Sequence, residues 1–155
     1  MFGMYAFMRL YLGVIVLLAT PPAEARQVLN GPVVAEVLEV IDGDTLAVRA
    51  HVWLGQTVET RVRLTGIDTP ELRGGCDAEK ALAERARRTL AALIGGRPVR
   101  LRDIEYDKYG GRVLARVETA DGIDPQKPLV AAGLATPYEG RGPRIDRCSI
   151  AARPG

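Results

Sequence analysis

Side chains alternate in character along two neighbouring stretches, residues 46–53 and 58–64, and this pattern constrains the fold more than any other feature. One set of alternating positions is Leu46, Val48, Ala50 and Val52 in the first stretch, and Val58, Thr60, Val62 and Leu64 in the second. A period of two with β-branched residues predicts strands with one buried face. Asp42-Gly43 is a strong hairpin signal, and Gly55-Gln56 marks the next turn. We expect Trp53, at a strand end, to pack against the fold.

The period changes to that of a helix between Asp77 and Ile94. Apolar residues recur there at spacings of four, four and three, which makes one helical stripe: Leu82, Ala86, Leu90 and Leu93. Asp77 is the expected N-cap. Gly95-Gly96, followed by Pro98, is expected to end the helix.

Three further strands complete the expected pattern. They begin at Val33, Val99 and Arg112, and the last two are joined by the turn 107–111. Five strands with a helix between the third and the fourth predict a mainly β fold with helices (α+β), a closed five-stranded barrel of the OB type. So few strands must close their sheet or cover its edges, and the helix would plug one end. Residues 128–135 are expected to form a short second helix, and the tail after Tyr138 to be irregular.

The first 25 residues have the layout of a secretory signal peptide. Arg9 precedes the apolar run Leu10–Ala19, and Ala23-Glu24-Ala25 offers small residues for cleavage. The uncharged stretch between Arg9 and Glu24 has 14 residues, fewer than the roughly 20 of an ordinary membrane span. We therefore expect cleavage rather than an uncleaved anchor, export to the periplasm or the medium, and no stable membrane association afterwards.

The 155-residue length fits one folded domain. We expect a short leader at 26–32, the domain at 33–148 and a tail at 149–155. The formal net charge of +2 is unchanged by cleavage, which removes one cation and one anion. Such a small charge does not by itself indicate a nucleic-acid binder, so any anion site must be local.

Two cysteines, Cys76 and Cys148, are present. In an oxidising compartment a pair of cysteines favours a disulfide over two free thiols. Half of a metal site is the other alternative, but a structural zinc site usually has four protein ligands, and we expect nothing else near the two cysteines to supply the other two.

Acidic residues gather around two short motifs. Asp44 ends the first turn, and Asp68 and Glu71 flank Thr69-Pro70. Pro70 keeps Thr69 extended, so that a backbone carbonyl is held in one direction. Two carboxylates, one carbonyl and several waters suit Ca²⁺, with Mg²⁺ as an alternative. Asp42 would orient this shell from behind, although each motif alone is also compatible with an ordinary turn or loop.

Two arginines are placed to act on a phosphate. Arg63 lies opposite the apolar face of its strand, and Arg112 opens a strand after a glycine turn. The guanidinium fork matches phosphate oxygens. Lys108 is a candidate phosphate contact, and Tyr109 and Tyr138 are candidates for stacking on bases of single strands, with ordinary packing as the alternative.

Three ordered motifs, Val40–Thr45, Val62–Glu71 and Asp107–Ala115, resemble the staphylococcal nuclease (thermonuclease) family. The resemblance covers about residues 33–138. It implies an OB-fold barrel that cleaves DNA and RNA with calcium and leaves 3′-phosphate ends. It also implies roles for individual residues: metal ligands at Asp44, Asp68 and the carbonyl of Thr69, and catalytic groups at Arg63, Glu71 and Arg112.

The chain departs from that family in two places. Two glycines, Gly110 and Gly111, precede Arg112 where the family usually has one. The chain also ends soon after Cys148, so we expect the disulfide to hold the tail in place of a third helix.

The leading hypothesis is an exported, monomeric, metal-dependent nuclease. A non-catalytic OB-fold module that binds nucleic acid or protein is the alternative, since fold alone does not decide function. A calcium-stabilised structural domain is a third possibility, which would need the carboxylates but not the arginines.

Overall fold

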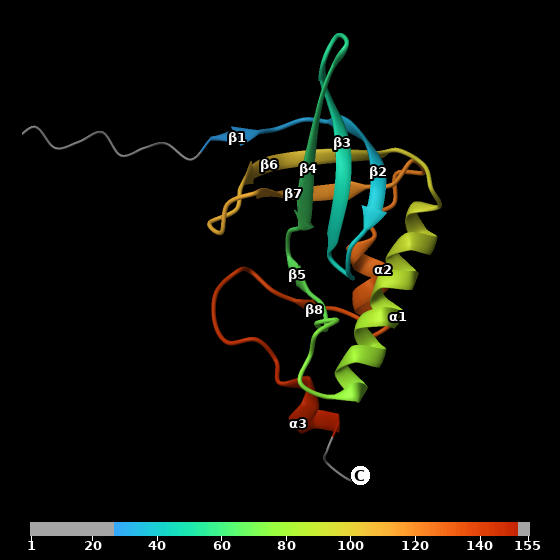
Figure 1. Cartoon of the computed structure of the whole chain (residues 1–155), viewed down its shortest axis with the longest axis vertical. Helices are drawn as coiled ribbons and strands as arrows, with labels where there is room; N and C mark the ends of the chain where they lie inside the picture. The colour runs from blue at the N-terminus through green and yellow to red at the C-terminus, as the bar shows by residue number, and fades with distance from the viewer. Residues whose placement is uncertain (1–26, 152–155) are drawn as a thin grey trace, which may run out of the picture.

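The structure, a computed structural model, describes residues 27–151, without the side chains of residues 150 and 151. The predicted signal peptide lies outside the described residues. Five long strands close into a barrel (Figure 1). They are β2 (Val33–Val40), β3 (Thr45–Trp53), β4 (Gln56–Leu64), β6 (Val99–Tyr106) and β7 (Arg112–Glu118).

Pairing between the strands runs round the whole ring. β2 pairs with β3, β3 with β4, β7 with β6 and β6 with β2, all antiparallel, while β4 and β7 pair in parallel. Each long strand thus has two neighbours, so closure of the ring removes the two free edges that a flat sheet of these strands would have. The prediction of a mainly β, five-stranded barrel of the OB type is confirmed.

Helix α1 (Asp77–Ile94) packs its predicted stripe onto the barrel core. Leu90 is fully buried there, and burial of such a side chain contributes about 1.5–3 kcal/mol. The helix ends where Gly95 adopts a left-handed conformation, with φ of 62°. The predicted bounds are confirmed, but the predicted N-cap is wrong by one residue. Cys76 occupies the N-cap position, without a capping hydrogen bond from its side chain, and Asp77 is the first helical residue.

The β3–β4 hairpin extends beyond the barrel (Figure 1). Pairing between β2 and β3 ends where Ala35 of β2 lies opposite Ala50 of β3. Beyond that pair, β3 and β4 are hydrogen-bonded only to each other. The alternating residues of this outer part consequently remain in solvent, with Val58 50% exposed and Trp53 76% exposed. The expectation that Trp53 packs against the fold is wrong.

The shorter elements differ from expectation more than the strands do. Part of the expected leader forms β1 (Val28–Leu29), which pairs with β6. Helix α2 (Gln126–Ala131) begins before the expected 128–135, because a helix tolerates Pro128 in its first turn. The tail that we expected to be irregular, without a third helix, contains the five-residue α3 (Arg147–Ala151).

Two short strands connect the barrel to this tail. β5 (Ile67–Asp68) follows β4 and pairs with β8 (Thr136–Pro137). Figure 1 shows them below the barrel, between it and α3. Within residues 27–151, no helix is both long and apolar enough to cross a membrane.

Candidate active site

The turn between β2 and β3 positions Asp44. The Asp42 carboxylate accepts a hydrogen bond from the Asp44 amide at 3.0 Å, which closes an Asx turn. A β-carbon added to Gly43 would lie 2.7 Å from the Ala86 β-carbon and 2.9 Å from Thr69 Cγ2. The absence of a side chain therefore lets the turn lie against α1 and the loop that carries Thr69. Asp42 thus holds the backbone of Asp44, and its role behind a shell of metal ligands stays a prediction.

Two buried carboxylates, Asp44 and Asp68, share the guanidinium of Arg63. Arg63 donates to Asp44 Oδ1 at 2.6 Å and to Asp68 Oδ1 at 3.3 Å. Asp44 Oδ2 also accepts from the Thr69 amide at 3.2 Å. Burial raises the pKa of Asp44 to about 6, against the opposing effect of Arg63, while Asp42 adds to the rise. Removal of the Asp44 carboxylate from water is therefore the main cause of the rise, and the nearby guanidinium offsets it only in part.

Glu71 lies on the loop between β5 and α1, with a half-exposed side chain. The loop is held by Glu79 in the first turn of α1, whose carboxylate accepts from the amides of Glu71 at 3.5 Å and Gly75 at 3.1 Å. Sequence reasoning had not assigned Glu79 this positioning role. The Glu71 carboxylate forms an ion pair with Arg144 from the tail.

Arg63 and Arg112 project from the outer face of the barrel on adjacent strands. The parallel pairing sets Arg61 opposite Arg112 and Arg63 opposite Leu114, so the two site arginines are diagonal neighbours on one face. Arg112 forms an ion pair with the buried Asp107, a partner that the sequence reasoning missed. With its extra glycine, the turn still leaves Arg112 beside Asp44 and Glu71 in the lining of one cavity.

The tail adds two arginines that the sequence reasoning missed. A disulfide joins Cys76 to Cys148, as predicted. Arg147 reaches Asp68 Oδ2 at 3.4 Å, and Arg144 Nε lies 3.4 Å from Asp68 Oδ1. A signal for them existed, because a bridge to Cys76 brings residues near Cys148 close to the loop that carries Glu71.

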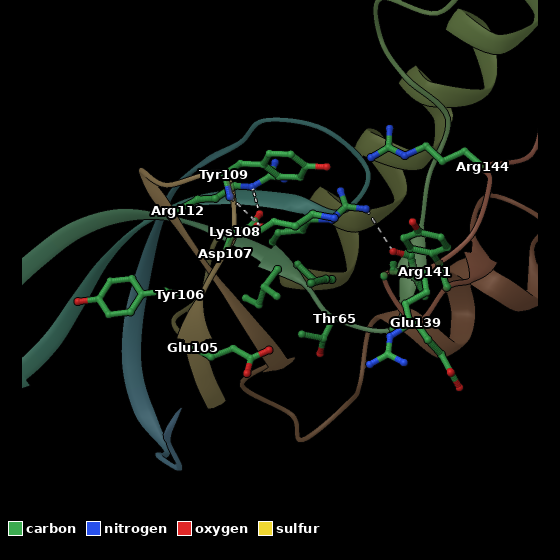
Figure 2. A pocket seen from close by; sticks show the side chains of 17 residues that line it. Thr65, Glu105, Tyr106, Asp107, Lys108, Tyr109, Arg112, Glu139, Arg141 and Arg144 are labelled. Atoms are coloured by element: carbon green, nitrogen blue, oxygen red, sulfur yellow. Dashed lines mark hydrogen bonds and ion pairs between the residues drawn. The ribbon is translucent and has the colours of Figure 1, made fainter. Parts of the chain in front are cut away.

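Two adjoining cavities surround these groups. The smaller, about 70 Å³, is lined by acids, arginines and the Thr69-Pro70 corner: Asp42, Asp44, Arg63, Thr69, Pro70, Glu71, Arg112 and Arg144. The larger, about 820 Å³, is lined among others by the three predicted nucleic-acid contacts, Lys108, Tyr109 and Tyr138. Figure 2 shows Tyr109 and Arg112 on one side of it and Arg141 and Arg144 on the other. Lys108 Nζ and Arg112 Cζ lie 5.0 and 5.6 Å from the centre of the Tyr109 ring.

The donor set of the smaller cavity suits a hard divalent cation. Carboxylate oxygens and a constrained peptide group are the ligands that Ca²⁺ and Mg²⁺ prefer. Asp44 fits this role directly, because its carboxylate is buried and lines the cavity. Asp68 lies beside it with arginines on both oxygens.

A second set of candidate metal ligands lies at the disulfide. Within residues 27–151, Cys76, Glu79 and Cys148 have their ligand atoms within 4.8 Å of one another. The two sulfur atoms are bonded to each other, so no thiolate is available to a metal there.

The barrel and this site together define the class: an OB-fold domain with a buried acidic centre flanked by arginines. The family model described as staphylococcal nuclease homologue matches residues 61–150. The chain is 34% identical over 151 residues to Protein ParB of Escherichia coli, covering 92% of this chain and 75% of that protein. It is 30% identical over 112 residues to uncharacterized endonucleases of Escherichia coli and Escherichia coli O157:H7, covering 72% of this chain. The aligned part spans 65% of the length of each endonuclease.

The chain belongs to the staphylococcal nuclease homologue family. The match to the family model begins at Arg61, after the turn that holds Asp44, whereas the alignment with ParB covers nearly the whole chain.

Proposed function

We propose that this protein is a metal-dependent nuclease that hydrolyses phosphodiester bonds in DNA, RNA or both. The proposal rests on one observation: a carboxylate suited to a cation, a half-exposed glutamate and two forked arginines line the same small cavity. These groups are Asp44, Glu71, Arg63 and Arg112. The family and its endonuclease relatives support the same activity.

Calcium is the ion that we propose, with magnesium as the alternative. Asp44, Asp68 and the Thr69 carbonyl would hold it. When bound, a divalent cation would polarise phosphorus through a non-bridging phosphate oxygen. Asp44 must be ionised to bind a cation. Because its pKa is raised to about 6, cation binding below about pH 6 releases the proton of the Asp44 carboxyl.

Glu71 is the proposed general base. Its exposed carboxylate borders the small cavity, where it would accept a proton from the attacking water. Its partner Arg144 comes from a different segment of chain, so the pair can open without disturbing the barrel. Removal of a general base typically slows a reaction by about 10²–10⁴.

Arg63 and Arg112 are the proposed stabilisers of charge on the phosphate. Each is held by a carboxylate, Arg63 by Asp44 and Arg112 by Asp107. These pairs restrict the two guanidiniums before substrate arrives, so less ordering is required during the reaction. A donor of this kind contributes roughly 10²–10³ in rate.

The larger cavity is proposed to hold the bases next to the scissile phosphate. Tyr109 is 72% exposed and stands above two cations, so its ring can stack on a base. Tyr138 would form a second platform, and Lys108 a phosphate contact. Stacking of this kind favours single strands and little sequence preference.

Incubation with single-stranded DNA tests the activity. The chain from Arg26 should digest it with calcium or magnesium and not with a chelator. Glu71→Gln and Arg112→Ala should each lose at least about 100-fold in rate, while Glu59→Gln, an exposed acid on the β3–β4 hairpin, should not. Digestion with chelator present, or full rates in both site variants, would reject the mechanism. Binding without cleavage would instead support the non-catalytic module.

We further propose that the 5′ oxygen leaves, so that products carry 3′-phosphates. Such ends block extension by a DNA polymerase until a phosphatase removes the 3′-phosphate, and immediate extension would contradict this chemistry.

Export to the periplasm or the medium is supported by the disulfide, since such bonds persist in oxidising compartments. An exported monomer with Arg26 as its first residue is the expected product; a larger species in the membrane fraction would contradict it.

A further inference from the structure

The tail between β8 and α3 runs past the mouth of the site and places Arg144 in it. Arg144 lines both the small cavity and the larger one. Figure 2 shows its side chain extending from the tail toward the side of the larger cavity that carries Tyr109 and Arg112. Arg144 is 47% exposed, unlike Arg147, which is 10% exposed. Of these two tail arginines, Arg144 is therefore the one that a substrate can reach.

The segment that carries Arg144 is fixed on both sides. On its C-terminal side, Cys148 is bonded to Cys76, and Arg147 donates to the Asp68 carbonyl at 3.1 Å. On its N-terminal side, the Tyr138 hydroxyl donates to the Gly142 carbonyl at 3.4 Å. Because the segment is held on both sides, the Arg144 guanidinium stays near the site. Little conformational entropy is then lost when this guanidinium binds a ligand.

Charge counting indicates what the tail contributes. Five acids belong to the site, each with a formal charge of −1: Asp42, Asp44, Asp68, Glu71 and Asp107. The barrel supplies the arginines Arg63 and Arg112. Without the tail arginines, the site would have a formal net charge of −3. A bound dication would reduce this to −1. Such a centre repels a phosphate. When Arg144 and Arg147 are included and the dication is bound, the formal net charge of the site becomes +1.

We propose that Arg144 is a third phosphate-binding guanidinium of this site. It would exchange its ion pair with Glu71 for the non-bridging oxygens of a substrate phosphate at the junction of the two cavities, leaving Glu71 unpaired. The ligand is the phosphodiester backbone of a single strand, and the inference rests on the proposed function for that substrate.

The salt dependence of binding tests this role without any cleavage. A fluorescein-labelled oligothymidylate with a phosphorothioate backbone, which resists hydrolysis, is titrated with the purified protein in calcium over a range of monovalent salt concentrations. Loss of one phosphate contact lowers the slope of log K against log salt by about 0.7 for a single strand. Arg144→Gln should show this change, and Arg144→Lys, which keeps the charge, should retain most of the slope.

Arg85→Gln is the matched control, since Arg85 is exposed on α1 and lines neither cavity. An unchanged slope in Arg144→Gln, an equal change in Arg85→Gln, or no binding by the wild-type protein would overturn the inference. Tighter binding by Arg144→Gln would also overturn it, because the tail would then be an inhibitory competitor. Absence of cleavage with metal would instead reject the nuclease, so the two failures are distinguishable.

Discussion

Gly43 is expected to be intolerant of even one added methyl group. Its backbone does not have a positive φ, so strain of the left-handed kind does not apply. The added carbon would meet Ala86 Cβ at 2.7 Å and Thr69 Cγ2 at 2.9 Å, whereas carbon atoms pack at about 3.5–4.0 Å. The turn must therefore move by roughly 1 Å, and overpacking of this kind costs about 1–3 kcal/mol.

The same shift should weaken the site. Moving the turn away from Thr69 lengthens the 3.2 Å hydrogen bond between the Thr69 amide and Asp44. Gly43→Ala should thus lower both the free energy of unfolding, measured in urea by circular dichroism, and the affinity for the activating cation, measured by calorimetry.

Gly75→Ala is the control for this substitution. Gly75 also lacks a positive φ, and its added carbon would meet only Cys148 Sγ, at an ordinary 3.8 Å. It should change stability by less than about 0.5 kcal/mol. In a double-mutant cycle, Ala86→Gly should offset part of the Gly43→Ala loss by removing the closest contact. A Gly43→Ala protein within 0.5 kcal/mol of wild type would refute the steric argument.

Three further predictions concern stability. Replacing Cys76 and Cys148 by alanine should lower the free energy of unfolding by at most about 4 kcal/mol, because the bridge spans 72 positions; an unchanged urea midpoint would contradict this. Asp44 has a folded pKa of about 6 against an ordinary 3.8, so the folded chain holds an extra proton between these values. The free energy of unfolding of the metal-free protein should therefore fall by on the order of 3 kcal/mol as pH rises from about 4 to 6. Asp44→Asn should remove this fall, and the same dependence of stability on pH in the variant and the wild-type protein would count against the argument. Leu90→Ala should cost about 2–5 kcal/mol, since Leu90 is fully buried; a thermal midpoint unchanged from wild type would show that the site repacks.

The long elements were predictable because their signals are local. A period of two marked β3 and β4, and the helical stripe of α1 contained Leu90 at its centre. The alternating pattern did not show where β3 and β4 leave the barrel, since Val58 fits a strand whether or not a second layer covers it. That outcome depends on how far the neighbouring strand β2 extends.

The candidate site was predictable only in part. The motifs around Asp44, Asp68 and Arg112 indicated residues that the structure brings together, because turn chemistry and proline geometry act over a few positions. Asp107 sits five positions before Arg112, yet its pairing required the turn to fold back on itself. Arg144 is 73 positions from Glu71, a separation at which sequence pattern carries no contact information.

Periodicity and turn residues in the sequence by themselves determined the strands, the main helix and the types of ligand atom available, since these follow from forces between near neighbours. Tertiary structure alone decided which distant groups share one cavity. Closing the ring through the parallel β4–β7 pair set Arg63 beside Arg112. Bonding Cys148 to Cys76 brought the tail cations to the acids. Both depend on contacts between segments far apart in the chain, where burial and ring closure, rather than local preference, select the partner.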